Sequence, residues 1–121
     1  MSKALTAKLT LTGTAANFGD ELALAVTSSL TVAAPIQGIS QQTITTADDQ
    51  QLIATTGGVK YFYAKNLDTT NFVILQTVAS QQYARLSPGE FAFFPVNDGN
   101  GLEARADTAS CILEFAFFTK A

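Results

Sequence analysis

The sequence predicts an all-β protein, an antiparallel β-sandwich of jelly-roll-like topology with about eight to ten short strands. Apolar and polar residues alternate in several segments with the two-residue period of a half-buried strand. Turn-forming residues recur about every 8–12 residues, and the segments between them are rich in β-branched and aromatic residues. Because the chain has 121 residues and no linker-like stretch, we expect a single domain over residues 1–121.

Strand signals in the first half of the chain begin with a strictly alternating segment. Within residues 4–12, the Leu and Ala side chains of the odd positions share one face, opposite Thr and Lys. Residues 21–27 fit a strand or a short helix, and the β-branched residues in and after them favour the strand. Residues 36–46, rich in Thr and Gln, fit an edge strand or a long loop. A short strand begins at residues 52–53, and turns are expected at residues 17–20, 48–49 and 57–58.

The second half of the chain contains all the aromatic residues except Phe18, so we expect it to supply most of the core. Residues 59–66 and 71–79 fit strands, and residues 67–70 between them fit a hairpin loop. Residues 87–90 read Ser-Pro-Gly-Glu, in which Pro at the second position and Gly at the third are typical of a type II turn. Further strands are expected at residues 82–86, 91–96, 102–106 and 111–118, with a turn over residues 97–101.

Composition excludes several classes of function. Charged residues make up only 14% of the chain, and Ser, Thr, Asn and Gln together account for 36 residues. Without histidine there is no imidazole base, no Ser/His or Cys/His dyad and no His-ligated metal. The single cysteine, Cys111, cannot form an internal disulfide, and its apolar sequence neighbours indicate a buried side chain rather than a reactive thiol. We therefore expect no enzymatic activity, no metal and no cofactor.

Charge and hydropathy narrow the range of partners. Seven basic residues and a net charge of −3 argue against binding of nucleic acid through a basic surface. No stretch of about 18 apolar residues is present, so we expect no membrane-spanning helix and no membrane partner. The first residues lack the basic start and apolar run of a secretory signal, so we expect synthesis in the cytoplasm.

The acidic residues and glycines at turns have simple structural interpretations. Catalytic carboxylate pairs face each other across a cleft, and nothing in this sequence requires such a pair. We interpret the following as solvated turn residues: Asp20, Glu21, Asp48, Asp49, Asp98 and Glu103. Residues 97–101 are similar in composition to part of a calcium loop, but with so few carboxylates a hairpin turn fits better. Gly57 and Gly58 precede no Lys-Ser/Thr pair, so we expect a turn there and no phosphate-binding loop.

Tyrosine and basic residues suggest one ligand site. Tyr61, Tyr63 and Tyr83, with Lys60 and Arg85, could form a stacking platform for a sugar or a single-stranded nucleic acid. In a strand, Tyr61 and Tyr63 share one face. The alternative, which we favour, is a sheet face that is shared between the core and a protein interface.

The last predicted strand is apolar on both of its faces. One row holds Cys111, Leu113, Phe115 and Phe117, and the other holds Ile112, Glu114, Ala116 and Phe118. Residues 91–96 show the same property, with Phe91 and Phe93 facing one way and Ala92, Phe94 and Val96 the other. A strand on the outside of a monomer usually has one polar row, so one outer face must be covered, by a loop or by another subunit. We favour the subunit, with Phe117 in the core and candidate interface residues Tyr61, Tyr63, Phe94, Ile112 and Phe118.

Three segments resemble sequence units of small virion proteins of tailed phages. Residues 61–73, which read YFYAKNLDTTNFV, resemble a "strand, Lys-Asn, turn, Thr-Asn, strand" unit. Residues 85–95, which read RLSPGEFAFFP, are similar to a "Leu-x-Pro-Gly-Glu, apolar strand, Pro" unit. Residues 102–111 and the aromatic strand after them are similar to a closing hairpin. The units together cover residues 59–118, and the N-terminal half contains none of them.

The resemblance implies a non-enzymatic capsid component of the virion. Such a component is a β-sandwich cement or decoration protein, a homotrimer on the capsid surface that binds the major capsid protein lattice and stabilises the head. Fibre and tail parts of phages use a similar sandwich, so a fibre or tail adaptor domain is the alternative location. A carbohydrate-binding module is the alternative that the tyrosine residues suggest.

Overall fold

The computed structural model describes residues 2–14, 22–33, 38–47, 50–97 and 99–121. Ten β-strands are present in these residues, and no helix, so none that could span a membrane. The structure divides into two compact units, one comprising Met1–Ala34 with Ala121 and the other Pro35–Lys120. The single domain expected over residues 1–121 stays a prediction.

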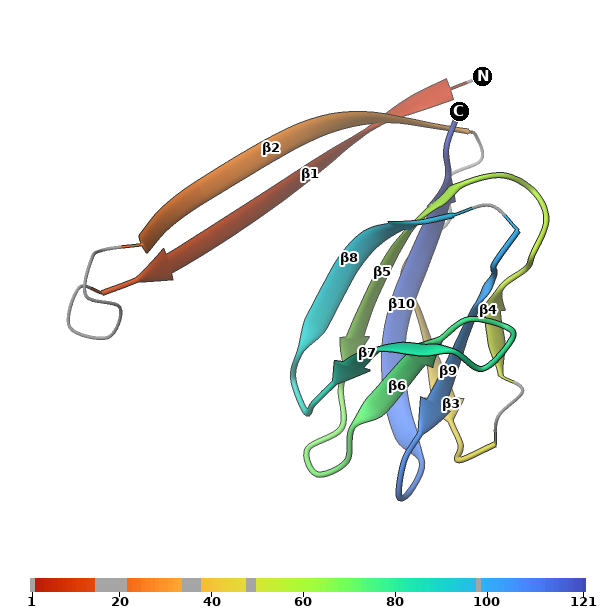
Figure 1. Ribbon diagram of the computed structural model, residues 1–121. Helices are drawn as coiled ribbons and strands as arrows, with labels where there is room; N and C mark the ends of the chain where they lie inside the picture. The colour runs from red at the N-terminus through yellow and green to blue at the C-terminus, as the bar shows by residue number, and fades with distance from the viewer. Residues whose placement is uncertain (1, 15–21, 34–37, 48–49, 98) are drawn as a thin grey trace. The chain divides into compact units, whose positions relative to one another are not determined.

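The first unit is a long β-hairpin. Strands β1 (Ser2–Gly13) and β2 (Leu22–Ala33) pair antiparallel in an unbroken register, from Ser2 opposite Ala33 to Gly13 opposite Leu22 (Figure 1). The strand interpretation of the segment after residue 21 is confirmed, and the strand continues to Ala33. The turn expected at residues 17–20 lies outside the described residues.

The second unit is a sandwich of two four-stranded antiparallel sheets, which confirms the all-β fold class predicted from the sequence (Figure 1). The first sheet has the order β3 (Ser40–Ile44), β10 (Cys111–Thr119), β5 (Lys60–Asn66) and β8 (Phe91–Val96). The second sheet has the order β4 (Gln51–Ile53), β9 (Leu102–Ala106), β6 (Val73–Gln76) and β7 (Gln82–Leu86). The Thr- and Gln-rich segment after residue 36 therefore contributes an edge strand, β3, rather than only a loop.

The connections show where local sequence patterns mislead. Residues 67–70 were expected to join two paired strands, but β5 and β6 lie in different sheets, so the hairpin prediction is wrong. The closing hairpin implied by the resemblance is wrong for the same reason, because β9 and β10 lie in different sheets. Among the eight strands from β3 to β10, β6 and β7 are the only two that follow each other in the chain and also pair with each other in a sheet. This connectivity is consistent with the expected jelly-roll-like topology.

The core lies between the two sheets. The largest fully buried apolar side chains come from both: Ile44, Phe62 and Leu113 from the first sheet, Leu75 and Leu102 from the second. Strand β9 lies between β4 and β6 and is buried on both faces along most of its length. Strands of antiparallel sheets more often have one face exposed to solvent. Its alanines, Ala104 and Ala106, belong to the same core. Apolar packing between the sheets thus determines which face of each strand points inward.

The turn at residues 87–90 has the predicted conformation. Gly89 has a φ of 81°, and the backbone N–H of Glu90 donates to the Ser87 carbonyl at 2.9 Å. Only glycine adopts this φ without strain, which explains the residue at the third position. The carboxylate of Glu90 also accepts a hydrogen bond from the Ser87 N–H at 2.7 Å. The turn expected at residues 48–49, and Asp98 in the turn over residues 97–101, lie outside the described residues.

Asn66 joins two loops at one end of the sandwich. Its side chain is fully buried, and its Nδ2 donates to the carbonyls of Asn71 at 2.9 Å and Leu86 at 3.0 Å. Its Oδ1 accepts from the Asp68 N–H at 2.9 Å, and its own backbone pairs with Gly89 and Glu90. A buried amide is tolerated only when its hydrogen-bonding groups have partners, and these contacts supply them. The asparagine therefore holds together two segments that look independent in the sequence.

Candidate protein interface on the outer face of the first sheet

The outer face of the first sheet is built from alternate residues of four strands. In β5, Phe62 and Ala64 fill the core, so Tyr61 and Tyr63 lie on the opposite face. The register places Tyr63 between Ala116 of β10 and Phe93 of β8. The next row along the strands places Tyr61 between two further residues, Phe118 and Pro95. These two rows across β10, β5 and β8 therefore consist of aromatic and apolar side chains, whereas β3 adds the polar Gln41 and Thr43 at the edge of the face.

Large apolar side chains on this face are exposed. Phe91 is 65% exposed, Ile112 is 48% and Phe93 is 42%. The charged side chains of the face, Lys65 and Glu114, occupy one row across β5 and β10. Contiguous exposed apolar surface is rare on monomeric proteins and marks sites of interaction. The face thus combines exposed apolar side chains with one charged row, a composition typical of protein interfaces.

Two contacts hold the aromatic side chains of the outer face in place. The rings of Tyr61 and Phe93 stack with their centroids 6.4 Å apart, and Tyr61 is buried although it lies on the outer face. The Tyr63 hydroxyl donates a hydrogen bond to Oε1 of Glu114 at 2.7 Å. Burial and the adjacent Glu114 carboxylate raise the pKa of Tyr63 to about 12. The hydroxyl therefore stays protonated, and the Glu114 charge has a partner within the face.

The candidate interface residues do not all lie together. Tyr61, Tyr63, Ile112 and Phe118 share the outer face of the first sheet, as their registers require. Phe94 instead belongs to the inward row of β8 and packs on the core, against Phe62 and Tyr83. Phe94 therefore points toward the core, and its prediction as an outward-facing interface residue is wrong. Phe117 packs against the core cluster, as expected from the sequence.

The sequence interpretation missed Phe91 and Phe93, which are the exposed aromatic residues of β8. Alternation showed correctly that both face away from Phe94, but it could not show which row points outward. That choice depends on pairing with β5, where Phe93 lies opposite Tyr63 and Phe91 opposite Lys65. No local signal in the sequence of β8 contains this information.

The residues expected to form a ligand platform are separated by the fold. Tyr83 and Arg85 belong to β7 in the second sheet, whereas Tyr61 and Tyr63 belong to β5 in the first. Lys60 is buried, and its Nζ donates to the carbonyls of Gly57 at 2.7 Å and Gly58 at 3.1 Å, which leaves it no role in a platform. The proposed combination of three tyrosines with Lys60 and Arg85 is therefore wrong.

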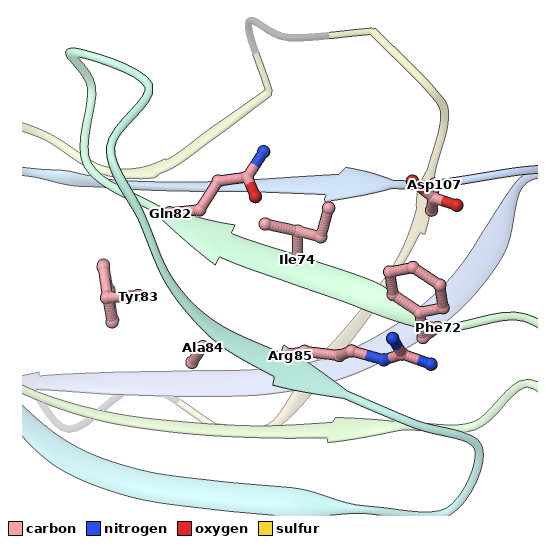
Figure 2. Close-up of a pocket in the computed structure, with 7 residues that line it drawn as sticks. All are labelled: Phe72, Ile74, Gln82, Tyr83, Ala84, Arg85 and Asp107. Carbon is pink, nitrogen blue, oxygen red and sulfur yellow. The ribbon is translucent and has the colours of Figure 1, made fainter.

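A shallow depression lies on the second sheet, with a volume of about 460 Å³ (Figure 2). The lining residues are Phe72, Ile74, Gln82, Tyr83, Ala84, Arg85 and Asp107. The Arg85 guanidinium stacks over the Phe72 ring at 3.7 Å from its centroid, so the cation is already paired with an aromatic face. Burial raises the pKa of Tyr83 to about 12. This depression offers a stacking surface but no enclosed cavity.

The two remaining candidates for chemistry, Glu103 and Cys111, have buried side chains. Glu103, expected to be a solvated turn residue, is buried in β9 and accepts a hydrogen bond from Nε2 of Gln76 at 3.1 Å. That expectation is wrong, because the strand begins one residue before Glu103 and carries it into the sheet. Cys111 is buried as expected, and burial together with the charge of Asp68 raises the pKa of its thiol. Among the described residues, no three acidic or cysteine side chains cluster as metal ligands would.

Comparison of the chain with protein-family models, with curated proteins and with solved structures found no match.

Proposed function

We propose that the chain is a non-enzymatic structural protein of a tailed-phage virion, of the capsid cement or decoration type. In this role it acts as a homo-oligomer, a trimer by the resemblance, that binds the lattice of the major capsid protein from outside the head. The observation that carries the proposal is the aromatic outer face of the first sheet, with Phe91, Phe93 and Ile112 exposed. The order of the sequence units over residues 59–118 supplies the virion context.

The arrangement of the sandwich suits this role for a physical reason. A cement protein stabilises a shell by mass action, because it binds the assembled lattice and not the separate subunits. Such binding requires a broad surface that stays rigid before and after contact, since ordering flexible groups lowers affinity. The stacked pair Tyr61 and Phe93 and the Tyr63–Glu114 hydrogen bond hold the outer face in one conformation. Aromatic side chains are also the residues that contribute most to protein interfaces.

Binding to assembled heads tests the proposal. Purified protein is mixed with heads that lack it, and with the soluble major capsid protein, and the bound fraction is measured by sedimentation. We expect saturable binding to the heads and none to the free subunit. Absence of binding to heads at micromolar concentration would rule out the cement role.

Electron microscopy of the intact particle separates the cement role from its closest alternative. Density for the sandwich on the capsid lattice supports the cement role, whereas density on a fibre or the tail assigns the chain to an adaptor. Glycan-array screening addresses the carbohydrate alternative, with Tyr83→Ala as the variant because Tyr83 lines the depression. We expect no glycan hit that depends on Tyr83.

A further inference from the structure

Lys65 lies between exposed apolar side chains on the outer face of the first sheet. It belongs to β5, which runs between β10 and β8. On the β8 side it is directly opposite Phe91, and Phe93 is the next outward residue of that strand. On the β10 side it is opposite Glu114, and Ile112 is the next outward residue there. Exposed apolar side chains therefore lie on both sides of this lysine.

The charges of Lys65 and Glu114 differ in how they are paired. Opposite charges directly across two antiparallel strands commonly attract each other. Here the Glu114 carboxylate is oriented toward the Tyr63 hydroxyl, from which it accepts the hydrogen bond of 2.7 Å. Among the residues that the structure describes, no hydrogen bond or ion pair reaches Nζ of Lys65. The outer face therefore carries one charge with a hydrogen-bond partner and one charge without.

A partner on this face would bury the unpaired ammonium. A lysine at the margin of an interface keeps its ammonium in water by extending its stem outward. Lys65 is already partly buried, and Phe91 and Ile112 flank it from two different strands, so a surface that covers both also covers the ammonium. An ammonium that loses its water without gaining an anion opposes binding strongly. Tight binding through this face thus requires an anion at Lys65.

We propose that the partner of the outer face presents a carboxylate that pairs with the Lys65 ammonium as the apolar side chains around it are buried. The inference rests on the proposed function, because it specifies the chemistry of the capsid surface that this face binds. Carboxylates are the groups that proteins carry as anions at neutral pH, and they accept charge-assisted hydrogen bonds from an ammonium. A single such pair within an apolar contact also fixes the register of the two surfaces and discriminates against surfaces without the carboxylate.

Zero-length cross-linking on assembled heads tests the inference. A carbodiimide activates a carboxylate, and a lysine amine in contact with it displaces the activating group, which leaves as a urea, to form an amide. The full-length protein is bound to heads that lack it, treated with carbodiimide and digested, and the joined peptides are identified by mass spectrometry. We expect Lys65 to be joined to a carboxylate of the capsid protein. Lys65→Arg, which keeps the charge but has no amine to form the amide, should bind and lose this product.

The affinity for the heads, measured by sedimentation, gives an independent result. Lys65→Met keeps the length of the side chain and removes its charge, so the carboxylate of the partner is left buried and unpaired. We expect at least roughly tenfold weaker binding for Lys65→Met, and at least roughly 100-fold for Lys65→Glu, which places like charges together. Lys8→Met and Lys8→Glu are the controls: they change the net charge equally at an exposed position of β1 and should bind like the wild type.

Three results would overturn the inference while the proposed function stands. In the first, Lys65→Met binds heads as tightly as the wild type. In the second, the bound wild type gives no carbodiimide product at Lys65, and in the third, the product joins Lys65 to Glu114 of its own chain. A wild type that does not bind heads removes the proposed function and this inference together. The cross-link on the wild type decides the question even if a Lys65 variant fails to fold, which urea unfolding of each variant checks.

Discussion

The Tyr63 hydroxyl donates a hydrogen bond of 2.7 Å to the Glu114 carboxylate and so joins strands β5 and β10 across the outer face of the first sheet. The contact gives the Glu114 carboxylate, one of the two charged groups on this face, a hydrogen-bond donor there. An interface can cover a paired charge at far lower cost than an unpaired one. The pair therefore lets the face be both soluble before binding and suitable for burial after it.

Removing the Tyr63 hydroxyl should destabilise the sandwich. Tyr63→Phe loses a hydrogen bond to a charged acceptor, so we expect the free energy of unfolding to fall by about 1–2 kcal/mol. The measurement is the midpoint of urea unfolding at pH 7. Tyr83→Phe is the matched control: burial alone raises the pKa of that hydroxyl, so we expect a loss below about 0.5 kcal/mol. Equal losses in the two variants would mean that the bond to Glu114 contributes nothing.

Stability should decrease at high pH because of the two tyrosines with raised pKa values. In the folded protein the pKa values of Tyr63 and Tyr83 are about 12, above the ordinary tyrosine value of 10.0. A raised folded-state pKa means that the stabilisation is fully present below pH 10 and is lost as the pH rises through 12. We expect unfolding midpoints to fall over this window. The double variant Tyr63→Phe/Tyr83→Phe should show a flatter profile, and an unchanged slope would contradict the assignment.

Asn66 should be among the polar residues most sensitive to substitution. Asn66→Ala leaves the carbonyls of Asn71 and Leu86 without the side-chain donor, and it opens a cavity in a fully buried position. We expect a loss of about 3 kcal/mol in the free energy of unfolding, measured by thermal and urea unfolding. Asn97→Ala, at an exposed position after β8, is the control and should be nearly neutral. A loss below 1 kcal/mol for Asn66→Ala would show that the two loops hold together without it.

Neighbouring phenylalanines in β10 should respond differently to truncation. Phe117 packs against the core, so Phe117→Ala should lower the free energy of unfolding. A fully buried Phe contributes about 3–5 kcal/mol. Because the Phe117 side chain is only partly buried, we expect a loss of about 3 kcal/mol. Phe118 lies on the outer face, so Phe118→Ala should cost about 1 kcal/mol and mainly weaken partner binding. Chemical unfolding of both variants checks the order, and the reverse order would invert the facing of β10.

Sequence patterns were sufficient for the strands and for the turn at residues 87–90. The period of two in β1 and the Pro-Gly pair before β8 each express a local constraint, so the fold class could be predicted. The pairing of strands could not be predicted. In sequence β5 and β6 look like a hairpin, but β5 pairs with β8 and β10, and β6 pairs with β7 and β9. Strand partners are chosen by burial of apolar faces between two sheets, which is a property of the whole chain.

The candidate interface was predictable only in part, for the same reason. Two apolar rows in β10 indicated that an outer face carries apolar side chains, and Ile112 and Phe118 lie on it. Alternation separates the two rows of β8 correctly, but the row with Phe94, predicted to face outward, packs against the core. Likewise, Glu103 is buried because Gln76 on the neighbouring strand β6 supplies a partner, which no local pattern reveals.

The most direct test of the central claim is co-sedimentation of the double variant Phe91→Ser/Phe93→Ser with assembled heads that lack this protein. Both side chains lie outside the core cluster, so the variant should keep the wild-type fold although it loses the Tyr61–Phe93 stack, as checked by circular dichroism and cooperative unfolding. Ile39→Ser, which removes an exposed apolar side chain outside the paired strands, is the control. We expect the double variant to lose at least roughly tenfold in affinity, a loss of about 1.4 kcal/mol, while the control binds like the wild type. Unchanged binding of a folded double variant would contradict the account, because the outer face of the first sheet would then not be the interface.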